Sequence, residues 1–313
     1  MRRLLLNRIV NHILLNYFNI LKENPTNLYR FQSIGRLINL IGSNCNGLIS
    51  RPNMLTPLLA FSLTVYAKFD EKDEEKKLFE RADKLFNENK FDSMVELLKS
   101  NPSWEDNNEV TWRLARCYYH QLKYRSDKGS PEYMEVLKGS LALIEKSLEI
   151  NSNCGPAHKW ASIILDEYST VQGTKVRIGN LLKIKGHMEK AIEYSPKDPT
   201  VYYLLGEWHY GCSSVTWVER NLAKIIYGSL PEASYETALE LFEQAEKIEP
   251  GFYSKNQIMI AKTLLALNRE KDKATDHLKA IVTKYKGSKK WADAEAYKEA
   301  TTLLSKIGEQ VPS

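Results

Sequence analysis

The chain has 313 residues, of which 43% are apolar and 27% charged, a balance that suits a soluble protein with a substantial core. Only 15 Gly and 11 Pro are present, which disfavours a multi-stranded β fold and favours helices joined by short connections. The net charge of +5 originates at the N-terminus, because residues 1–69 carry eight Lys or Arg and a single acid, Glu23. The remaining residues sum to −2, which argues against nucleic-acid binding by the folded body.

The N-terminal residues 1–69 are expected to form a targeting or apolar segment ahead of the folded part. Residues 1–36 are rich in Arg, Leu, Ile and Asn and nearly free of acid, which is typical of a mitochondrial transit peptide. Residues 54–67 are the most apolar stretch, but a membrane span needs about 20 residues, so membrane contact and a buried helix both remain open. Because the composition becomes highly charged at Asp70, we predict a domain at 70–306 and a tail at 307–313.

Helical spacing of apolar residues dominates from residue 76 onward, and strand-like alternation is absent. The tetratricopeptide repeat, a pair of antiparallel helices, places small, aromatic and apolar residues at fixed offsets and ends with Pro. Nine positions follow that pattern in register apart from one insertion: Ala191, Pro196, Tyr202, Leu205, Gly206, Ala238, Phe242, Ala245 and Pro250. The predicted fold is therefore all-α, with tetratricopeptide-like antiparallel helical hairpins stacked into a superhelix.

The spacing within one hairpin is too long. Gly206 and Ala238 are 32 residues apart, whereas a plain repeat separates these positions by about 12. We therefore predict an insertion at about 207–235. The spacing of Trp217, Leu222 and Ile226 favours a short additional amphipathic helix within it.

No catalytic motif stands out, since the chain has no Gly-rich phosphate loop, no nucleophile elbow and no His-Glu-x-x-His sequence. His209 and Cys212 have metal-like spacing but lack two further ligands nearby. The expectation is a protein that is not an enzyme and holds no cofactor or metal. Trp160, Trp208 and Tyr210 are candidate groove-lining aromatics, although such residues more often pack hairpins together.

The most distinctive charge feature is a basic stretch between residues 255 and 290 with a net charge of +7. Its candidate binding residues are Lys255, Lys262, Arg269, Lys271, Lys273, Lys279, Lys284 and Lys286. A basic end of this kind can meet an acidic partner such as a tubulin tail or an anionic membrane. It can equally be a solvated helix face.

Several motifs in the middle of the chain resemble one family. They are Ala157-His-Lys-Trp-Ala161, Ile178-Gly-Asn180, Ile184-Lys-Gly-His-Met-Glu-Lys-Ala-Ile-Glu193, Ser195-Pro-Lys-Asp-Pro-Thr200, Tyr203-Leu-Leu-Gly-Glu-Trp208, Ser234-Tyr-Glu-Thr-Ala-Leu239 and Pro250-Gly-Phe-Tyr-Ser-Lys-Asn256. Over roughly residues 78–306 the chain is similar to the regulator of microtubule dynamics family, and its N-terminus is most similar to that of the mitochondrial member. The resemblance implies a monomeric tetratricopeptide-like protein that associates with microtubules and spindle poles, with some members mitochondrial, and it supplies no catalytic residues.

Two functions follow from these observations. The first is a non-catalytic microtubule-associated adaptor that influences microtubule dynamics and spindle or chromosome segregation, with tubulin as partner. The alternative is a mitochondrial scaffold that binds a protein peptide or a lipid in its concave groove. The corresponding locations are the mitochondrion, from the N-terminal composition, or the cytoplasm, cytoskeleton, spindle and spindle poles.

Overall fold

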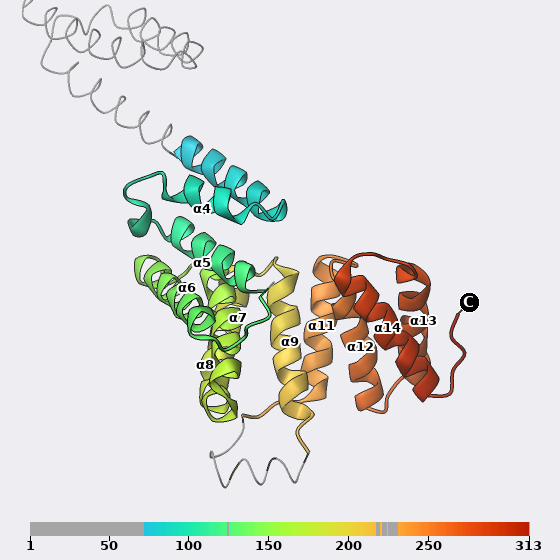
Figure 1. Ribbon diagram of the computed structural model, residues 1–313. Helices are drawn as coiled ribbons and strands as arrows, with labels where there is room; N and C mark the ends of the chain where they lie inside the picture. The colour runs from blue at the N-terminus through green and yellow to red at the C-terminus, as the bar shows by residue number, and fades with distance from the viewer. Residues whose placement is uncertain (1–71, 124, 217–219, 221–223, 225–230, 313) are drawn as a thin grey trace, which may run out of the picture. The chain divides into compact units, whose positions relative to one another are not determined.

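The computed structural model describes residues 72–123, 125–216, 220, 224 and 231–312 (Figure 1). The chain divides into two compact units, Met1–Glu75 and Lys76–Ser313, and the second unit carries the fold and the site. The transit-like residues 1–36 and the apolar stretch 54–67 lie outside the described residues. The domain start at Asp70 stays a prediction.

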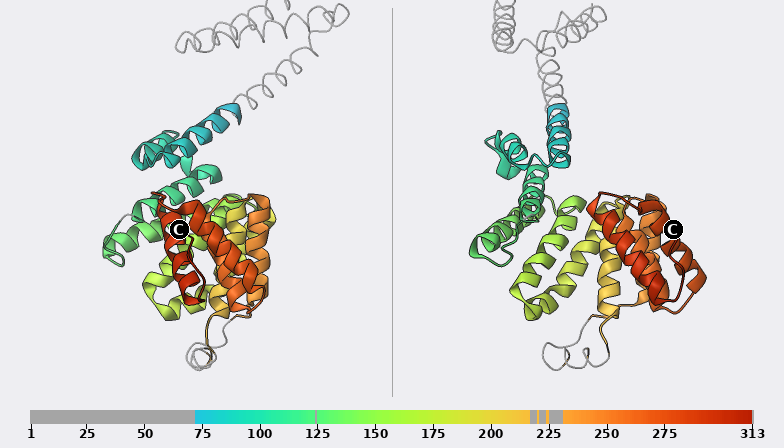
Figure 2. Two further views of the ribbon diagram at one scale, coloured as in Figure 1. Left: turned by 90° about the vertical axis from the view of Figure 1, so that its right-hand side faces the viewer. Right: turned by 45° about the vertical axis from the view of Figure 1, so that its right-hand side comes forward.

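Every regular element in the described part of the chain is helical. After a first helix through residues 72–87, the order is α4 (Phe91–Lys99), the short 3₁₀ helix η2 (Trp104–Asp106), α5 (Asn108–Leu122), α6 (Pro131–Ile150), α7 (Gly155–Gln172), α8 (Thr174–Tyr194), α9 (Pro199–Ser213), α11 (Tyr235–Ile248), α12 (Ser254–Ala266), α13 (Lys271–Tyr285) and α14 (Trp291–Lys306). Helices pack as successive pairs, α5 with α6, α7 with α8, α9 with α11 and α12 with α13, and α14 covers the last pair (Figures 1 and 2). This arrangement of stacked hairpins confirms the predicted all-α, tetratricopeptide-like fold.

Local sequence signals fix where the helices begin. The side chains of Asn107, Ser130, Asp198 and Ser234 accept hydrogen bonds from backbone N–H groups in the first turns of α5, α6, α9 and α11. Each such cap satisfies a donor that has no partner inside the helix. Pro stands in the first turn of α6, α7 and α9, where its missing N–H is not needed.

The repeat positions of α9 and α11 bring these two helices into close contact. Gly206 faces the ring of Phe242, and a Cβ built on Gly206 would lie 2.6 Å from one ring carbon. Phe242, Ala238 and Ala245 are fully buried, as is Ala191 on α8, and Leu205 is 6% exposed. These small residues let the helices approach while Phe242 fills the space between them.

The two prolines of the pattern lie in the turns after α8 and α11. The hydroxyl of Tyr202 donates to the carbonyl oxygen of Pro196 at 3.2 Å, which ties the start of α9 to the preceding turn. Pro250 follows Glu249, the C-cap residue of α11. Both prolines therefore stand where the second helix of a repeat must stop.

The insertion begins later than its predicted start at residue 207. Helix α9 continues to Ser213 and α11 starts at Tyr235, so the connection comprises residues 214–234. The helix extends because Trp208 and Cys212 lie on the same buried face as Leu205, at helical spacing, and all three pack against α8. The additional helix predicted around Trp217, Leu222 and Ile226 lies outside the described residues.

The last residues pack back onto the body. The Lys279 ammonium lies 3.0 Å from a carboxylate oxygen of Glu309, and Val311 is partly buried against the C-terminal core. The described part of the predicted 307–313 tail, residues 307–312, is therefore anchored by an ion pair and an apolar contact. Of the helices in the described residues, none combines the length and apolar character that crossing a bilayer requires.

The first helix is joined to α5 by two arginines that share one acid. Arg113 and Arg116 both bind the carboxylate of Asp83, and their side chains are only 10% and 13% exposed. The Arg116 guanidinium lies 3.8 Å from the ring centroid of Phe86, a stacked cation–π contact. Ion pairs and a cation–π contact, as well as apolar packing, therefore join the first helix to α5.

Candidate functional site

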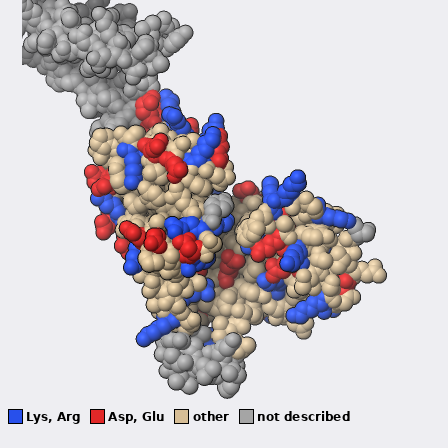
Figure 3. Space-filling view, viewed as in Figure 1, with Lys and Arg blue, Asp and Glu red and all other residues tan. Residues whose placement is uncertain are grey.

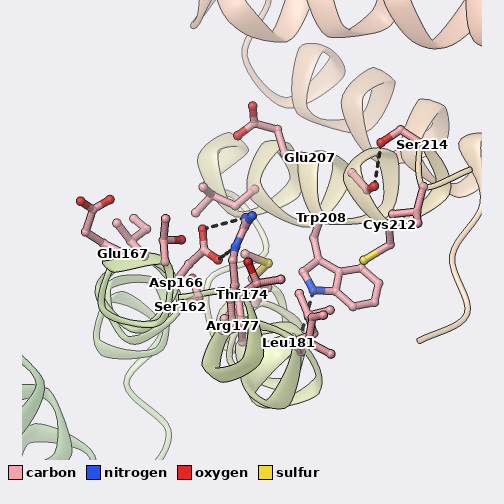
Figure 4. Close-up of a pocket in the computed structure, with 18 of the residues that line it drawn as sticks. Ser162, Asp166, Glu167, Thr174, Arg177, Leu181, Glu207, Trp208, Cys212 and Ser214 are labelled. Atoms are coloured by element: carbon pink, nitrogen blue, oxygen red, sulfur yellow. Dashed lines mark hydrogen bonds and ion pairs between the residues drawn. The ribbon is translucent and has the colours of Figure 1, made fainter. Parts of the chain in front are cut away.

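A cleft of about 990 Å³ opens between α7, α8 and α9 (Figure 4). Its floor is apolar and includes Leu181, Ile184 and Trp208, while its polar lining includes Asp166 and Arg177. Such a volume with a few convergent polar groups is typical of a binding site for a small molecule or a short peptide segment.

An ion pair crosses the cleft wall from α7 to α8. The Arg177 guanidinium donates from Nε to Asp166 Oδ1 at 3.0 Å and from an NH₂ group to Asp166 Oδ2 at 3.4 Å (Figure 4). The neighbouring carboxylate, Glu167, points to α6 instead and accepts from the Tyr133 hydroxyl at 2.8 Å. Because adjacent residues on a helix diverge by about 100°, the two carboxylates bind different partners and cannot act together on one atom.

Trp208 forms part of the cleft floor. Its indole N–H donates to the carbonyl oxygen of Leu181 at 3.2 Å, so the ring spans from α9 to α8 (Figure 4). The ammonium of Lys185 lies 5.5 Å from the Trp208 ring centroid, and the whole residue is only 8% exposed. The ring is thus rigidly placed, with part of its surface facing the cleft.

Glu207 brings a second acidic group to the cleft lining. Removal of water by the surrounding protein raises the pKa of its carboxyl, whereas the Tyr203 hydroxyl and the Lys255 and Lys262 ammonium groups act in the opposite direction. The residue nevertheless remains exposed, so water moderates that shift. With Asp166, Glu167 and Glu207 against Arg177, the charged groups that line the cleft have a negative sum.

The three predicted groove aromatics do not come together. Trp160 packs on α5, with its ring centroid 5.4 Å from that of His120. Tyr210 makes an edge-to-face contact with Tyr235 of α11 at 5.2 Å. Of the three, only Trp208 lines the cleft, and the sequence pattern did not single out Arg177 or Glu207, its charged neighbours.

Most of the predicted basic residues are paired with acids. The pairs are Lys255–Glu295, Lys262–Glu299, Arg269–Glu236, Lys273–Glu243 and Lys279–Glu309, with distances from 2.7 to 3.5 Å. The acids come from α11, α14 and the C-terminal residues, all outside the basic stretch of the sequence. Figure 3 accordingly shows positive and negative side chains interspersed over the C-terminal hairpins rather than one uniform basic face.

The remaining members, Lys271, Lys284 and Lys286, have no ion-pair partner among the described residues. Lys271 starts α13, whereas Lys284 lies about 20 Å away near its end, at 1.5 Å of rise per residue. Lys284, Lys286, Lys289 and Lys290 follow one another there, and we call them the C-terminal basic cluster. The basic surface is therefore smaller than the sequence count indicates and is centred on the turn between α13 and α14.

Metal binding receives no support from the described part of the chain, where no three His, Cys, Asp or Glu residues converge as potential ligands. His209 and Cys212 both lie on α9, and each is only 8% exposed. Burial raises the pKa of the Cys212 thiol, so the neutral, unreactive form is favoured.

Comparison with known proteins decides the family. The model for regulator of microtubule dynamics proteins 1–3 matches residues 78–308. The chain belongs to the regulator of microtubule dynamics family. The protein is 36% identical over 191 residues to regulator of microtubule dynamics protein 1 of Mus musculus, covering 61% of this chain and 62% of the relative. The corresponding match to the Pongo abelii protein is 34% identical over 233 residues and covers 74% and 73%.

The family also includes more distant relatives. Regulator of microtubule dynamics protein 2 of Bos taurus is 30% identical over 194 residues, which cover 61% of this chain and 47% of the relative. Among solved structures, a thermophilic TPR protein of Thermus thermophilus superposes with a TM-score of 0.48 at 15% identity, covering 73% of this chain and all of that one.

Proposed function

We propose that this protein is a non-catalytic, microtubule-associated adaptor that influences microtubule dynamics. The observation that carries this proposal is the family match over residues 78–308, because the relatives bear the name regulators of microtubule dynamics. A stack of helical hairpins suits this role, since it offers extended binding surfaces without a catalytic constellation. A role in the spindle and in chromosome segregation belongs to the same proposal.

The C-terminal basic cluster supports an electrostatic contact with the acidic microtubule surface. Its four lysines have no ion-pair partner among the described residues, so their charge is available to a partner. Charge-dominated association weakens as salt screens it, with a Debye length of about 10 Å at 0.1 M. Binding by this cluster is thus expected to be strong at low ionic strength and to fall steeply as salt is added.

Co-sedimentation of the purified full chain with microtubules tests the proposal. We expect binding that decreases as KCl rises and that is weakened by Lys284→Glu with Lys286→Glu. The matched control is Lys138→Glu on α6 with Lys247→Glu on α11, two exposed lysines without an ion-pair partner among the described residues. Absence of the wild-type chain from the pellet at low salt would refute the function, and equal binding of the cluster variant would refute the assigned surface.

The cleft favours a second function, the capture of a peptide segment. Its apolar floor accommodates an apolar side chain, while the negative sum of its charged groups favours a segment that also carries Lys or Arg. The same charges disfavour an anionic lipid headgroup, the other ligand considered for the groove. Fluorescence anisotropy of labelled Leu- and Lys-containing peptides tests this, and Arg177→Glu should increase the affinity for the basic peptides if they bind in the cleft.

The N-terminal residues 1–69 are proposed to direct the chain to mitochondria, on the strength of their Arg-rich, acid-poor composition. Microtubule association and a mitochondrial address are compatible if the protein has two locations. Expression of the full chain and of residues 70–313, each tagged at the C-terminus, separates the two contributions. Mitochondrial full-length protein with a diffuse fragment supports an address in 1–69, and identical patterns contradict it.

A further inference from the structure

Helix α8 presents lysines to solvent along one line. Lys175, Lys183 and Lys190 are all exposed and have no ion-pair partner among the described residues. With 100° per residue, these three positions fall within about 80° of arc on the helix, on one side. Leu182 lies on the same side and is 67% exposed, among the most exposed large apolar side chains of the described residues. We call these four residues the α8 lysine row.

The surface around the row is open. Gly179 and Gly186 lie between the lysines, and a Cβ added to either would meet no atom within 4 Å. The apolar side chains of α8 that do pack, Ile184 and Met188, face the opposite direction into the core with Trp208. Among the described residues the row is therefore an uncovered helix face, while the opposite face of α8 packs into the core.

The electrostatic potential along the α8 lysine row is positive. Lys183 and Lys190 both lower the pKa of His187, in addition to the larger effect of burial, and no acid opposes them there. The acids of this helix are Glu189, which is paired with Lys185 at 3.0 Å, and Glu193, which stands at the end of the row. A negative group that approaches between residues 175 and 190 thus meets mainly positive charge.

We propose that the α8 lysine row binds an extended acidic polypeptide, and, on the basis of the proposed function, that this polypeptide is an acidic tubulin tail. Successive lysines lie about 10–12 Å apart along the axis, since each residue rises 1.5 Å. An extended chain covers that interval with about three to four residues, so a tail with frequent acids can contact all three lysines. Lysine acts as a point charge without demanding a fixed geometry, which suits a flexible tail of variable sequence.

The apolar content of the row argues against a membrane as the occupant. A helix that lies on a bilayer inserts a broad apolar face. Here Leu182 alone projects from the row, whereas Ile184 and Met188 are buried in the hairpin core. One apolar side chain beside a line of charges instead fits a peptide that offers an occasional apolar residue among its acids.

The direct test uses the full chain and a synthetic Glu-rich peptide in fluorescence anisotropy. Reversal of the row by Lys175→Glu, Lys183→Glu and Lys190→Glu should weaken binding about tenfold or more, since three favourable contacts become repulsive. The matched control reverses the same amount of charge at Lys84, Lys138 and Lys247, three exposed lysines outside both basic surfaces, and should bind the peptide within about twofold of wild type. Thermal unfolding of both variants verifies that they are folded.

Unchanged peptide binding by the row variant would overturn the inference. So would wild-type binding to phosphatidylserine vesicles without binding to the peptide, which would assign the row to a membrane. Microtubules with and without their acidic tails separate this inference from the proposed function. If wild type and row variant co-sediment equally with microtubules, the proposed microtubule function stands and the α8 lysine row is not the binding surface. If the peptide binds through the row but the chain does not co-sediment with microtubules, the proposed microtubule function fails instead.

Discussion

The contact between Gly206 and Phe242 predicts that Gly206→Ala destabilises the protein, whereas Gly→Ala inside a helix usually stabilises it. Gly in a helix interior is less stable than Ala by about 0.5–1 kcal/mol, so Gly→Ala at an open site should stabilise. At Gly206 the new Cβ would lie 2.6, 2.8 and 3.0 Å from three ring carbons of Phe242, well inside the optimum of about 3.5–4.0 Å. Phe242 is fully buried and cannot swing away, so Gly206→Ala overpacks the core.

Overpacking of this kind costs about 1–3 kcal/mol, which outweighs the gain in helix propensity. We therefore expect Gly206→Ala to lower the free energy of unfolding by about 1–2 kcal/mol. The matched control is Gly139→Ala in the middle of α6, where an added Cβ meets nothing within 4 Å; it should raise that free energy by about 0.5–1 kcal/mol. Urea unfolding followed by circular dichroism measures both.

A companion substitution checks the physical cause. Phe242→Leu removes part of the ring that the new methyl group would meet, so the double variant with Gly206→Ala should lose less stability than the two single changes sum to. Equal stability of Gly206→Ala and Gly139→Ala would refute the close-approach argument. So would strict additivity in the double variant, because it would place the loss somewhere other than this contact.

Three further predictions concern stability. His158 and His187 face each other with their Nδ1 atoms 2.9 Å apart, and burial lowers the pKa of both, that of His187 to about 4. Between pH 6.5 and 4 the unfolded chain therefore binds protons that the folded chain does not, so the free energy of unfolding should fall by about 2 kcal/mol over this range, after allowance for solvent screening. Urea titrations should show a flatter pH profile for His187→Gln. Trp208→Phe should lower the free energy of unfolding by about 1 kcal/mol in thermal unfolding, because the hydrogen bond from the indole N–H to the Leu181 carbonyl is lost. A neutral result would show that this hydrogen bond does not stabilise the packing of α9 on α8. Asp83→Asn should cost about 2 kcal/mol, because Arg116 keeps its charge but loses its counterion in a mostly buried position, and stability above wild type would mean that burying this ion pair was unfavourable.

The repeat fold was predictable because its signal is local and periodic. Ala191, Ala238 and Ala245 must be small where helices cross, and Phe242 must be large where hairpins meet, so sequence spacing alone reveals their roles. The end of α9 was harder to predict. The pattern gives the positions of a plain repeat, but Cys212 continues the buried face of the helix beyond them.

The candidate sites could not be derived in the same way. The lysines of the basic stretch are close together in the sequence and are easily counted. The acids that neutralise them lie about 30 residues away, as in the pairs Lys273–Glu243 and Lys279–Glu309. The cleft depends on how α8 and α9 pack, which brings Trp208 to Leu181 across 27 residues. Charge counts along a chain therefore overstate a patch whenever neighbouring helices carry the opposite charge.

We propose that this protein acts on microtubules through its own folded body. The most direct measurement is light microscopy of dynamic microtubules grown from purified tubulin, with the fluorescently labelled full chain added at low and at physiological salt. We predict that the chain decorates the microtubule lattice, changes growth or shortening rates, and dissociates as salt rises. Unchanged dynamics with no decoration at low salt would contradict it.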